Sequence, residues 1–207
     1  MERRKVEVRL DARMDADAIE AAGFDHVFVA TGARWPRPNV PGADLGHVQT
    51  VDDLGEWLGA AGGAISERGR SFAVIGGNRA GIALAGVARA RGAEVVVLEP
   101  GTVFAAANGL VGRWRYVHEA LEAGIWLEPQ ATLRAVDRGS VHWVDAEGAE
   151  RSSPADQVIV SSGALPDTTL VDHLVDRGIA ARALGDCFSI GLVEGAMQRA
   201  AELLLDL

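Results

Sequence analysis

The glycines at positions 76, 77 and 81 lie between an apolar run and a segment with helical character, and this spacing suits anion binding. Gly76 allows a tight turn, and Gly81 allows a helix to pack closely against a strand. A helix that begins here directs free backbone N–H groups and the positive end of its dipole at an anion such as a pyrophosphate. The spacing therefore predicts the phosphate-binding turn of a dinucleotide site, formed by Gly76, Gly77, Asn78, Arg79, Ala80 and Gly81.

An acidic residue follows this turn at the distance that a ribose contact requires. Glu99 ends the next apolar run, residues 94–98, at about the spacing from Gly81 seen in dinucleotide sites. A carboxylate there accepts hydrogen bonds from the adenosine ribose hydroxyls and repels a 2′-phosphate. The pattern favours NAD(H) over NADP(H).

One residue of the turn departs from the usual glycine pattern, and an arginine follows it. Asn78 stands where the middle glycine is expected, and its side chain is predicted to occupy space that the pyrophosphate uses. Arg79 has two open interpretations. It can pair with a pyrophosphate oxygen, or it can accommodate a 2′-phosphate and reverse the preference for NAD(H).

The scarcity of certain residue types excludes several classes of enzyme. Lys5 is the only lysine and lies outside any P-loop or Schiff-base context. Tyr116, the only tyrosine, is followed four residues later by Ala120 and not by the lysine that short-chain dehydrogenases use. Cys187 is the only cysteine, so this chain alone forms no disulfide and holds no iron–sulfur cluster. No metal site is predicted, and redox chemistry must belong to a bound cofactor.

The charge balance and hydropathy limit the partners that we expect. The formal net charge is −9 and the basic residues are not clustered, which argues against nucleic acid as a partner. No apolar run approaches the roughly 20 residues that cross a bilayer, and no apolar signal core follows the first residues. We expect a cytoplasmic protein without membrane contact.

Alternating apolar and polar segments predict the elements on either side of the turn. The first part should contain a strand over Val6–Leu10, a helix capped by Asp15 and ended by Gly23, and a strand from His26 that is buried on both faces. Thr50 should cap a helix through Leu58, followed by a linker over 59–69.

The second part should begin with a strand, a helix and a strand over 71–100, and a helix over 112–124. Three short strands around Trp126, Leu133 and 141–144, a buried strand over 156–162 and a last helix over 192–206 should follow. Strands alternating with helices predict the α/β class, a doubly wound parallel sheet covered by helices, with a Rossmann-like NAD domain over 70–160.

Three further Gly-containing pairs give the sequence a resemblance to a known family. Thr31–Gly32 follows one apolar run, Ser162–Gly163 follows another, and Gly185–Asp186 precedes the last helix. In this order they resemble the strand crossings and late Gly-Asp of flavoproteins with two dinucleotide-binding domains, the pyridine nucleotide-disulfide oxidoreductase type. The sequence is most similar to the C-terminal FAD/NAD module of the 2,4-dienoyl-CoA reductase and trimethylamine dehydrogenase group, which follows an old yellow enzyme-type barrel, and residues 110–119 support that branch.

The resemblance implies an NAD domain inserted into a partial FAD-binding domain, with FAD-type segments over 1–60 and 161–207. Thr31, Gly32, Ser162, Gly163, Gly185 and Asp186 are then candidate cofactor contacts. The family's FAD-binding glycine turn would precede Val6, where only five residues stand. FAD binding therefore requires a partner chain in a hetero-oligomer, or the segment is a remnant that binds no FAD.

Two functions follow from these observations. The first is an NAD(P)/FAD-dependent oxidoreductase component that relays electrons between a nicotinamide or another carrier and a flavin, as a subunit of a split flavoenzyme. The alternative is a non-catalytic module whose degenerate Rossmann site binds ADP or NAD, or a purely structural subunit. No residue is singled out as catalytic.

Overall fold

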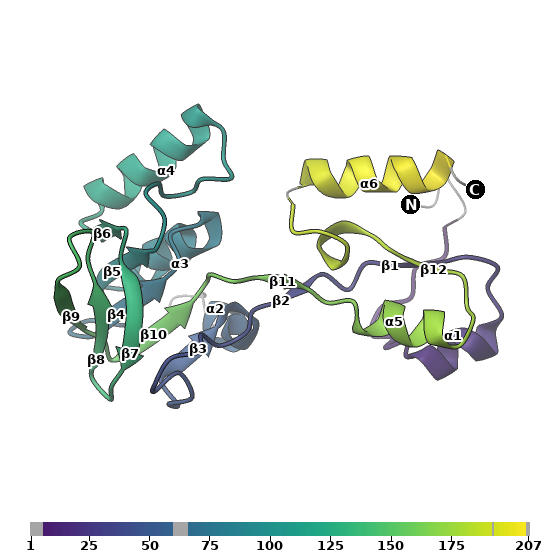
Figure 1. Ribbon diagram of the computed structural model, residues 1–207, viewed down its shortest axis with the longest axis horizontal. Coiled ribbons are helices and arrows are strands. Elements are labelled where there is room, and N and C mark those ends of the chain that lie inside the picture. The colour runs from purple at the N-terminus through teal and green to yellow at the C-terminus, as the bar shows by residue number, and fades with distance from the viewer. Residues whose placement is uncertain (1–5, 60–65, 192, 206–207) are drawn as a thin grey trace. The chain divides into compact units, whose positions relative to one another are not determined.

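The computed structural model describes residues 6–59, 66–191 and 193–205, and it divides the chain into two compact units (Figure 1). The central unit spans Trp35–Ala164. The flanking unit is formed by the chain before and after it, up to Arg34 and from Leu165. Within the described residues, no helix is long and apolar enough to cross a membrane.

A five-stranded parallel sheet forms the middle of the central unit. Its strand order is β3-β10-β4-β5-β6, and every neighbouring pair is parallel. The strands are β3 (Val48–Thr50), β10 (Gln157–Val160), β4 (Ser71–Ile75), β5 (Glu94–Glu99) and β6 (Trp126–Pro129). The predicted α/β class with a parallel sheet is confirmed. Pairing of β3 with β10 brings residues 35–59 into the central unit, whereas the sequence analysis grouped them with the first FAD-type segment.

Helices cover one face of this sheet. Helices α3 (Arg79–Ala90) and α4 (Leu110–Glu122) lie on that face, as Figure 1 shows. Phe72 and Val97 of the sheet pack there against Ala85 of α3 and Ala120 of α4. The predicted strand, helix and strand over 71–100 and the helix near 112–124 are therefore present.

A second sheet covers the other face, where the sequence analysis expected helices. It is antiparallel, with order β7-β8-β9, and consists of β7 (Thr132–Val136), β8 (Ser140–Val144) and β9 (Glu150–Pro154). Val141 and Trp143 of β8 are buried against Ala73 and Leu98 of the central sheet. On this face the alternating residues of β8 bury the apolar surface that a helix would otherwise cover.

Strand β9 was not predicted from the sequence. Its five residues are polar or proline, and only Ser153 is buried. The strand forms because β8 offers a row of backbone hydrogen-bonding groups along its whole length, in the register Val141↔Ser153. A pairing of this kind leaves little trace in the hydrophobic pattern of the added strand.

The connection after β3 is helical, as predicted. It begins as the 3₁₀ turn η2 (Val51–Leu54) and continues as α2 (Gly55–Gly59). The Asp53 carboxylate accepts hydrogen bonds from the backbone N–H and the hydroxyl of Thr50, at 2.9 and 3.2 Å. Thr50 thus marks the start of this helix. Part of the predicted 59–69 linker lies outside the described residues.

The flanking unit contains two small sheets and three helices among the described residues. Parallel strands β1 (Val27–Val29) and β12 (Ala181–Ala183) pair with each other, and antiparallel strands β2 (Ala33–Arg34) and β11 (Leu165–Pro166) form the second sheet. The helical elements are α1 (Ala16–Ala22), α5 (Thr169–Asp176), the 3₁₀ turn η3 (Gly185–Cys187) and α6 (Val193–Leu205). A small core of Ile19, Val29, Leu174 and Cys187 lies among them.

The caps of α1 are those expected from the sequence. The Asp15 carboxylate accepts a hydrogen bond from the Ala18 N–H, and Gly23 ends the helix in the left-handed conformation. The last helix, α6, is likewise close to its predicted range.

Two strand predictions in this unit were wrong. Residues 6–10 form no strand, and Val6, Val8 and Leu10 are all exposed. Strand β1 is not buried on both faces, because Phe28 is 38% exposed. A strand requires a partner strand to satisfy its backbone groups, and no described strand pairs with residues 6–10.

Candidate functional site

The glycine turn follows the last residue of β4 and requires glycine for two reasons. Gly76 has a φ of 106°, a region that side chains rarely adopt. A Cβ atom at this position would also lie 2.7 Å from the backbone nitrogen of Ser162. The Gly76 N–H donates a hydrogen bond of 2.8 Å to the Leu98 carbonyl. The turn is therefore held between the end of β5 and the chain that leaves β10.

Helix α3 begins directly against this turn. A Cβ atom at Gly81 would lie 1.9 Å from the Gly76 carbonyl oxygen, so no other residue fits without displacing the backbone. This is the close helix packing that the sequence predicted for Gly81.

Asn78 caps α3 and is tied back to the protein. Its Oδ1 accepts hydrogen bonds from the Gly81 N–H at 2.9 Å and from the Ser161 hydroxyl at 2.8 Å. Its Nδ2 donates a hydrogen bond of 2.5 Å to the Ser161 carbonyl. The sequence analysis expected this side chain to occupy the pyrophosphate space, whereas here the amide is turned toward the helix and the end of β10.

Arg79 and Ala80 form the exposed first turn of α3. The first N–H groups of a helix have no partner within the helix, and Asn78 satisfies only that of Gly81. In the described part of the chain the N–H groups of Arg79 and Ala80 have no protein acceptor. The Arg79 guanidinium lies 5.7 Å from the ring centre of Tyr116 on α4, so its charge stays beside this helix terminus.

Glu99 connects the turn to the loop that follows β5. Its Oε2 accepts a hydrogen bond of 2.6 Å from the Gly77 N–H, and its Oε1 accepts one of 2.8 Å from the Gly101 N–H. Each carboxylate oxygen has a further lone pair, so the group can still accept from a ribose hydroxyl. The carboxylate is thus oriented before any ligand arrives.

The same loop packs over Gly77. The Ala105 N–H donates a hydrogen bond of 2.7 Å to the Gly77 carbonyl, and Phe104 is buried above it. A Cβ atom at Gly77 would lie 2.2 Å from the Phe104 ring. Gly77 is therefore required for the loop to close over the turn, a role that the sequence analysis did not assign.

Ser162 and Gly163 complete the group of candidate residues in the central unit. The Ser162 N–H donates a hydrogen bond of 3.1 Å to the Ile75 carbonyl, and Gly163 has a φ of 75°. The structure thus brings them beside Gly76, at the carboxyl ends of β4 and β10. Parallel α/β sheets bind their ligands at this edge.

The other candidate residues lie in the flanking unit, around Asp167. The Thr31 hydroxyl donates to the Asp167 carbonyl at 3.1 Å, and the Asp167 N–H donates to the Gly32 carbonyl at 3.1 Å. The Cys187 thiol, buried, donates to the same Asp167 carbonyl at 3.0 Å. The hydroxyl and N–H of Thr169 hold the pKa of the Asp167 carboxyl below its usual value.

Gly185 and Asp186 shape the loop before α6. Gly185 has a φ of 64°, and the Asp186 carboxylate accepts a hydrogen bond of 3.0 Å from the Gly191 N–H. The loop and the first turns of α6 line a hollow of about 260 Å³, with the Arg199 guanidinium 4.0 Å from the ring centre of Phe188. Asp186 therefore closes this loop through its Oδ1 atom.

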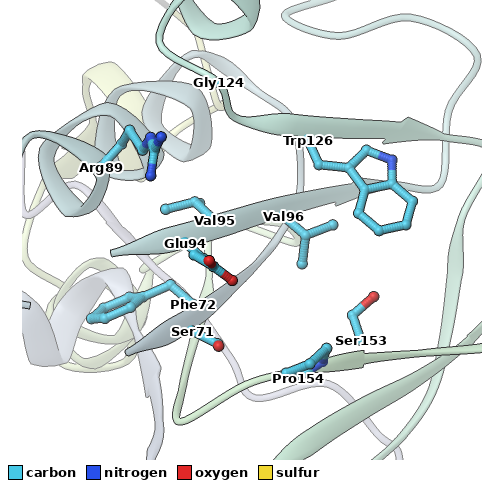
Figure 2. Close-up of a pocket in the computed structure, with 10 residues that line it drawn as sticks. All are labelled: Ser71, Phe72, Arg89, Glu94, Val95, Val96, Gly124, Trp126, Ser153 and Pro154. Atoms are coloured by element: carbon cyan, nitrogen blue, oxygen red, sulfur yellow. The ribbon is translucent and has the colours of Figure 1, made fainter. Parts of the chain in front are cut away.

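A larger hollow of about 350 Å³ lies at the opposite edge of the central sheet (Figure 2). Ser71 and Glu94, which line it, are the first residues of β4 and β5, whereas Gly76 and Glu99 lie at or just beyond the other ends of these strands. Trp126 and Ser153 also border it. The hollow is thus separate from the glycine turn.

Ser161 is the residue at this site that sequence reasoning missed. It lay within the predicted strand 156–162, and its side chain is fully buried. The available signal was a polar residue directly after three buried apolar ones, at the end of a strand that neighbours β4.

Comparisons with known proteins agree with this geometry. Residues 1–198 match the family model of the pyridine nucleotide-disulphide oxidoreductases. The chain is 26% identical over 198 residues to an NADH oxidase of Thermoanaerobacter brockii, covering 95% of this chain and 30% of that protein. It therefore spans about a third of the length of this relative.

Solved structures show the same fold. A 2-naphthoyl-CoA reductase complex matches with a TM-score of 0.85 and 21% identity, over 100% of this chain and 30% of that one. Histamine dehydrogenase from Rhizobium sp. 4-9 matches with a TM-score of 0.79 and 19% identity, over 95% and 33%. The resemblance drawn from the glycine-containing pairs is confirmed, and the chain belongs to the pyridine nucleotide-disulphide oxidoreductase family.

Proposed function

We propose that this chain is the NAD(H)-binding component of an FAD-dependent oxidoreductase and relays electrons between the nicotinamide and a flavin. The observation that carries the proposal is the glycine turn with Glu99 already oriented beside it. NAD(H) is an intracellular carrier, so we further propose that the protein works in the cytoplasm.

The residues of the turn fit a dinucleotide. The free N–H groups of Arg79 and Ala80 and the dipole of α3 suit a pyrophosphate, and the lack of a Cβ at Gly76 and Gly81 lets the chain turn tightly in front of it. The Glu99 carboxylate suits the ribose hydroxyls and disfavours a 2′-phosphate. The nicotinamide supplies hydride transfer when bound, and the protein supplies binding and orientation.

The flanking unit is proposed to form one part of an FAD-binding site, and the rest of that site must come from elsewhere. We propose that a partner subunit supplies it, and that the pairs Thr31–Gly32 and Gly185–Asp186 then face the flavin cofactor. The exposed apolar side chains of Met14, Phe24 and Phe28 border a hollow of about 460 Å³ near β1. Exposed apolar surface of this kind is typical of a protein interface.

Isothermal titration of the purified chain with NADH, NADPH and ADP tests the nucleotide proposal. We expect NADH to bind, and NADPH to bind about tenfold more weakly because its 2′-phosphate meets Glu99. A preference for NADPH would indicate that Arg79 leaves Tyr116 to pair with the 2′-phosphate. Binding of ADP alone, or of no nucleotide, would contradict the redox role and favour the non-catalytic module.

The flavin proposal has a separate test. The chain should be purified from its native source by an affinity tag under mild conditions, and its mass and visible spectrum recorded. We expect an assembly larger than the chain that carries flavin absorbance. A colourless monomer that binds NADH would contradict the FAD part of the proposal and leave the nucleotide part intact.

A further inference from the structure

We propose that Ser161 is a positioning residue for the nucleotide and acts by holding the Asn78 amide away from the pyrophosphate. This inference rests on the proposed NAD(H) site and goes beyond it, because Ser161 is fully buried and would act only through Asn78. We call the pair formed by Asn78 and Ser161 the clasp.

The clasp consists of two reciprocal hydrogen bonds between residues that are far apart in the sequence. Ser161 Oγ donates to Asn78 Oδ1 at 2.8 Å, and Asn78 Nδ2 donates to the Ser161 carbonyl at 2.5 Å. A third hydrogen bond, from the Gly81 N–H to the same Oδ1, makes the amide the cap of α3. Together these bonds define both the position and the flip of the carboxamide.

Within the described residues, the Ser161 hydroxyl has one hydrogen-bond partner, Asn78 Oδ1. Its hydroxyl is fully buried, and a Cβ atom at Gly81 would lie 3.0 Å from Ser161 Oγ. The backbone N–H of Ser161 donates to the Ile75 carbonyl at 2.8 Å, which anchors the residue to β4 independently of its side chain. Removing the hydroxyl should therefore loosen the amide without displacing the backbone, because the amide keeps its hydrogen bonds to the Ser161 carbonyl and the Gly81 N–H but loses the third.

The consequence for ligand binding follows from the place of Asn78 in the turn. A glycine at this position would leave the space before α3 open, whereas an asparagine amide that rotates forward enters it. The clasp removes this conformer and leaves the N–H groups of Arg79 and Ala80 accessible. The clasp therefore lets the turn contain Asn78, although the sequence alone predicts that this side chain obstructs the pyrophosphate site.

A double-mutant cycle tests the proposal with NADH titrations and thermal unfolding. Ser161→Ala should weaken NADH binding about fivefold, because an amide released from one hydrogen bond visits the pyrophosphate space. Asn78→Ser keeps a capping hydroxyl but has no amide to rotate. In this background Ser161→Ala should leave the NADH affinity unchanged within about twofold.

The matched control is Ser153→Ala, at the opposite edge of the sheet. Ser153 is also buried, and its hydroxyl accepts one side-chain hydrogen bond, from Trp143 at 3.2 Å. This change should lower the unfolding temperature to a similar extent and leave NADH binding unchanged. A general loss of packing would affect both serine variants alike.

The outcomes separate the clasp from the proposed function. If the unaltered chain binds NADH and Ser161→Ala binds it equally well, the positioning role is overturned and the proposed function stands. Equal weakening by Ser161→Ala in both backgrounds also overturns it, because the effect then does not pass through Asn78. If the unaltered chain binds no nucleotide, the proposed function fails and the clasp proposal fails with it.

Discussion

The central and flanking units differ in how fully they bury their own apolar residues. The central sheet has buried clusters on both faces, under α3 and α4 on one side and under the sheet β7-β8-β9 on the other. The flanking unit has a small cluster around Leu174, and it leaves Val8, Leu10, Phe24 and Phe28 exposed.

This difference bears on what each unit needs in order to work. The central unit also exposes apolar residues on α4, such as Trp114, but every hydrogen bond that shapes its glycine turn comes from within the unit. Small cores bury a low fraction of their surface and are marginally stable. We therefore expect the central unit to be the stable, nucleotide-binding part, and the flanking unit to depend on a covering surface.

The largest expected effect is on the core of the central unit. Phe72 is 1% exposed, so Phe72→Ala should lower the free energy of unfolding by about 3–5 kcal/mol. Phe24 of the flanking unit is 57% exposed, and Phe24→Ala should change it by less than about 0.5 kcal/mol. Urea unfolding measures both. A large effect at Phe24 would break the comparison, because the flanking unit would then bury this ring by itself.

The second largest effect is expected at Gly81 in the glycine turn, and Gly86 in the same helix, α3, provides the control. Gly81→Ala should destabilise the chain by about 1–3 kcal/mol and remove measurable NADH binding, since the Gly76 carbonyl occupies the Cβ position. Gly86 lies in the same helix with open space around its Cβ position, and Gly86→Ala should stabilise the chain by about 0.5–1 kcal/mol. Thermal unfolding and titration of both variants check this pair.

A smaller effect is expected from Glu99→Gln. The amide has one acceptor oxygen where the carboxylate has two, so either Gly77 or Gly101 loses its hydrogen bond, at a cost of about 1 kcal/mol. The change should also remove the repulsion of a 2′-phosphate. The ratio of NADH to NADPH affinity should therefore fall about tenfold in parallel titrations. An unchanged ratio would show that Glu99 orients the loop without facing the ribose.

The smallest expected effect is a loss of folding stability at acidic pH, through one carboxylate in each unit. The Arg151 guanidinium, 2.8 Å away, holds the pKa of the Asp145 carboxyl below its usual value, with help from the Ala149 N–H. A lowered folded-state pKa favours the ionised form in the folded state. The resulting stability is fully present above the unfolded pKa, about 4, and is lost as the pH falls through the folded pKa.

Unfolding midpoints measured against pH check this sign. The difference in unfolding midpoint between the unaltered chain and Asp145→Asn should be constant near neutral pH and shrink below about pH 4. Asp167→Asn, in the flanking unit, should behave in the same way because Thr169 lowers the pKa of Asp167. A difference that grows on acidification would contradict the assignment at that residue.

Much of the fold could be predicted where the signal is local. The cap at Asp15, the left-handed end at Gly23 and the turn between Gly76 and Gly81 each depend on residues within one or two helical turns. Glu99 could be predicted from its spacing alone, and the structure places it beside Gly77. The order of the glycine-containing pairs was sufficient to indicate the family.

The remaining features depend on contacts between distant parts of the chain, which no local pattern encodes. By itself the sequence determined the parallel α/β unit and its glycine turn, because steric and hydrogen-bonding rules act over a few residues. Only the tertiary structure decided that β9 forms, that residues 6–10 form no strand, and that Ser161 holds Asn78. Each of these features depends on whether a hydrogen-bonding partner from a distant part of the chain lies next to it. Backbone and side-chain polar groups form hydrogen bonds only where such a partner is present.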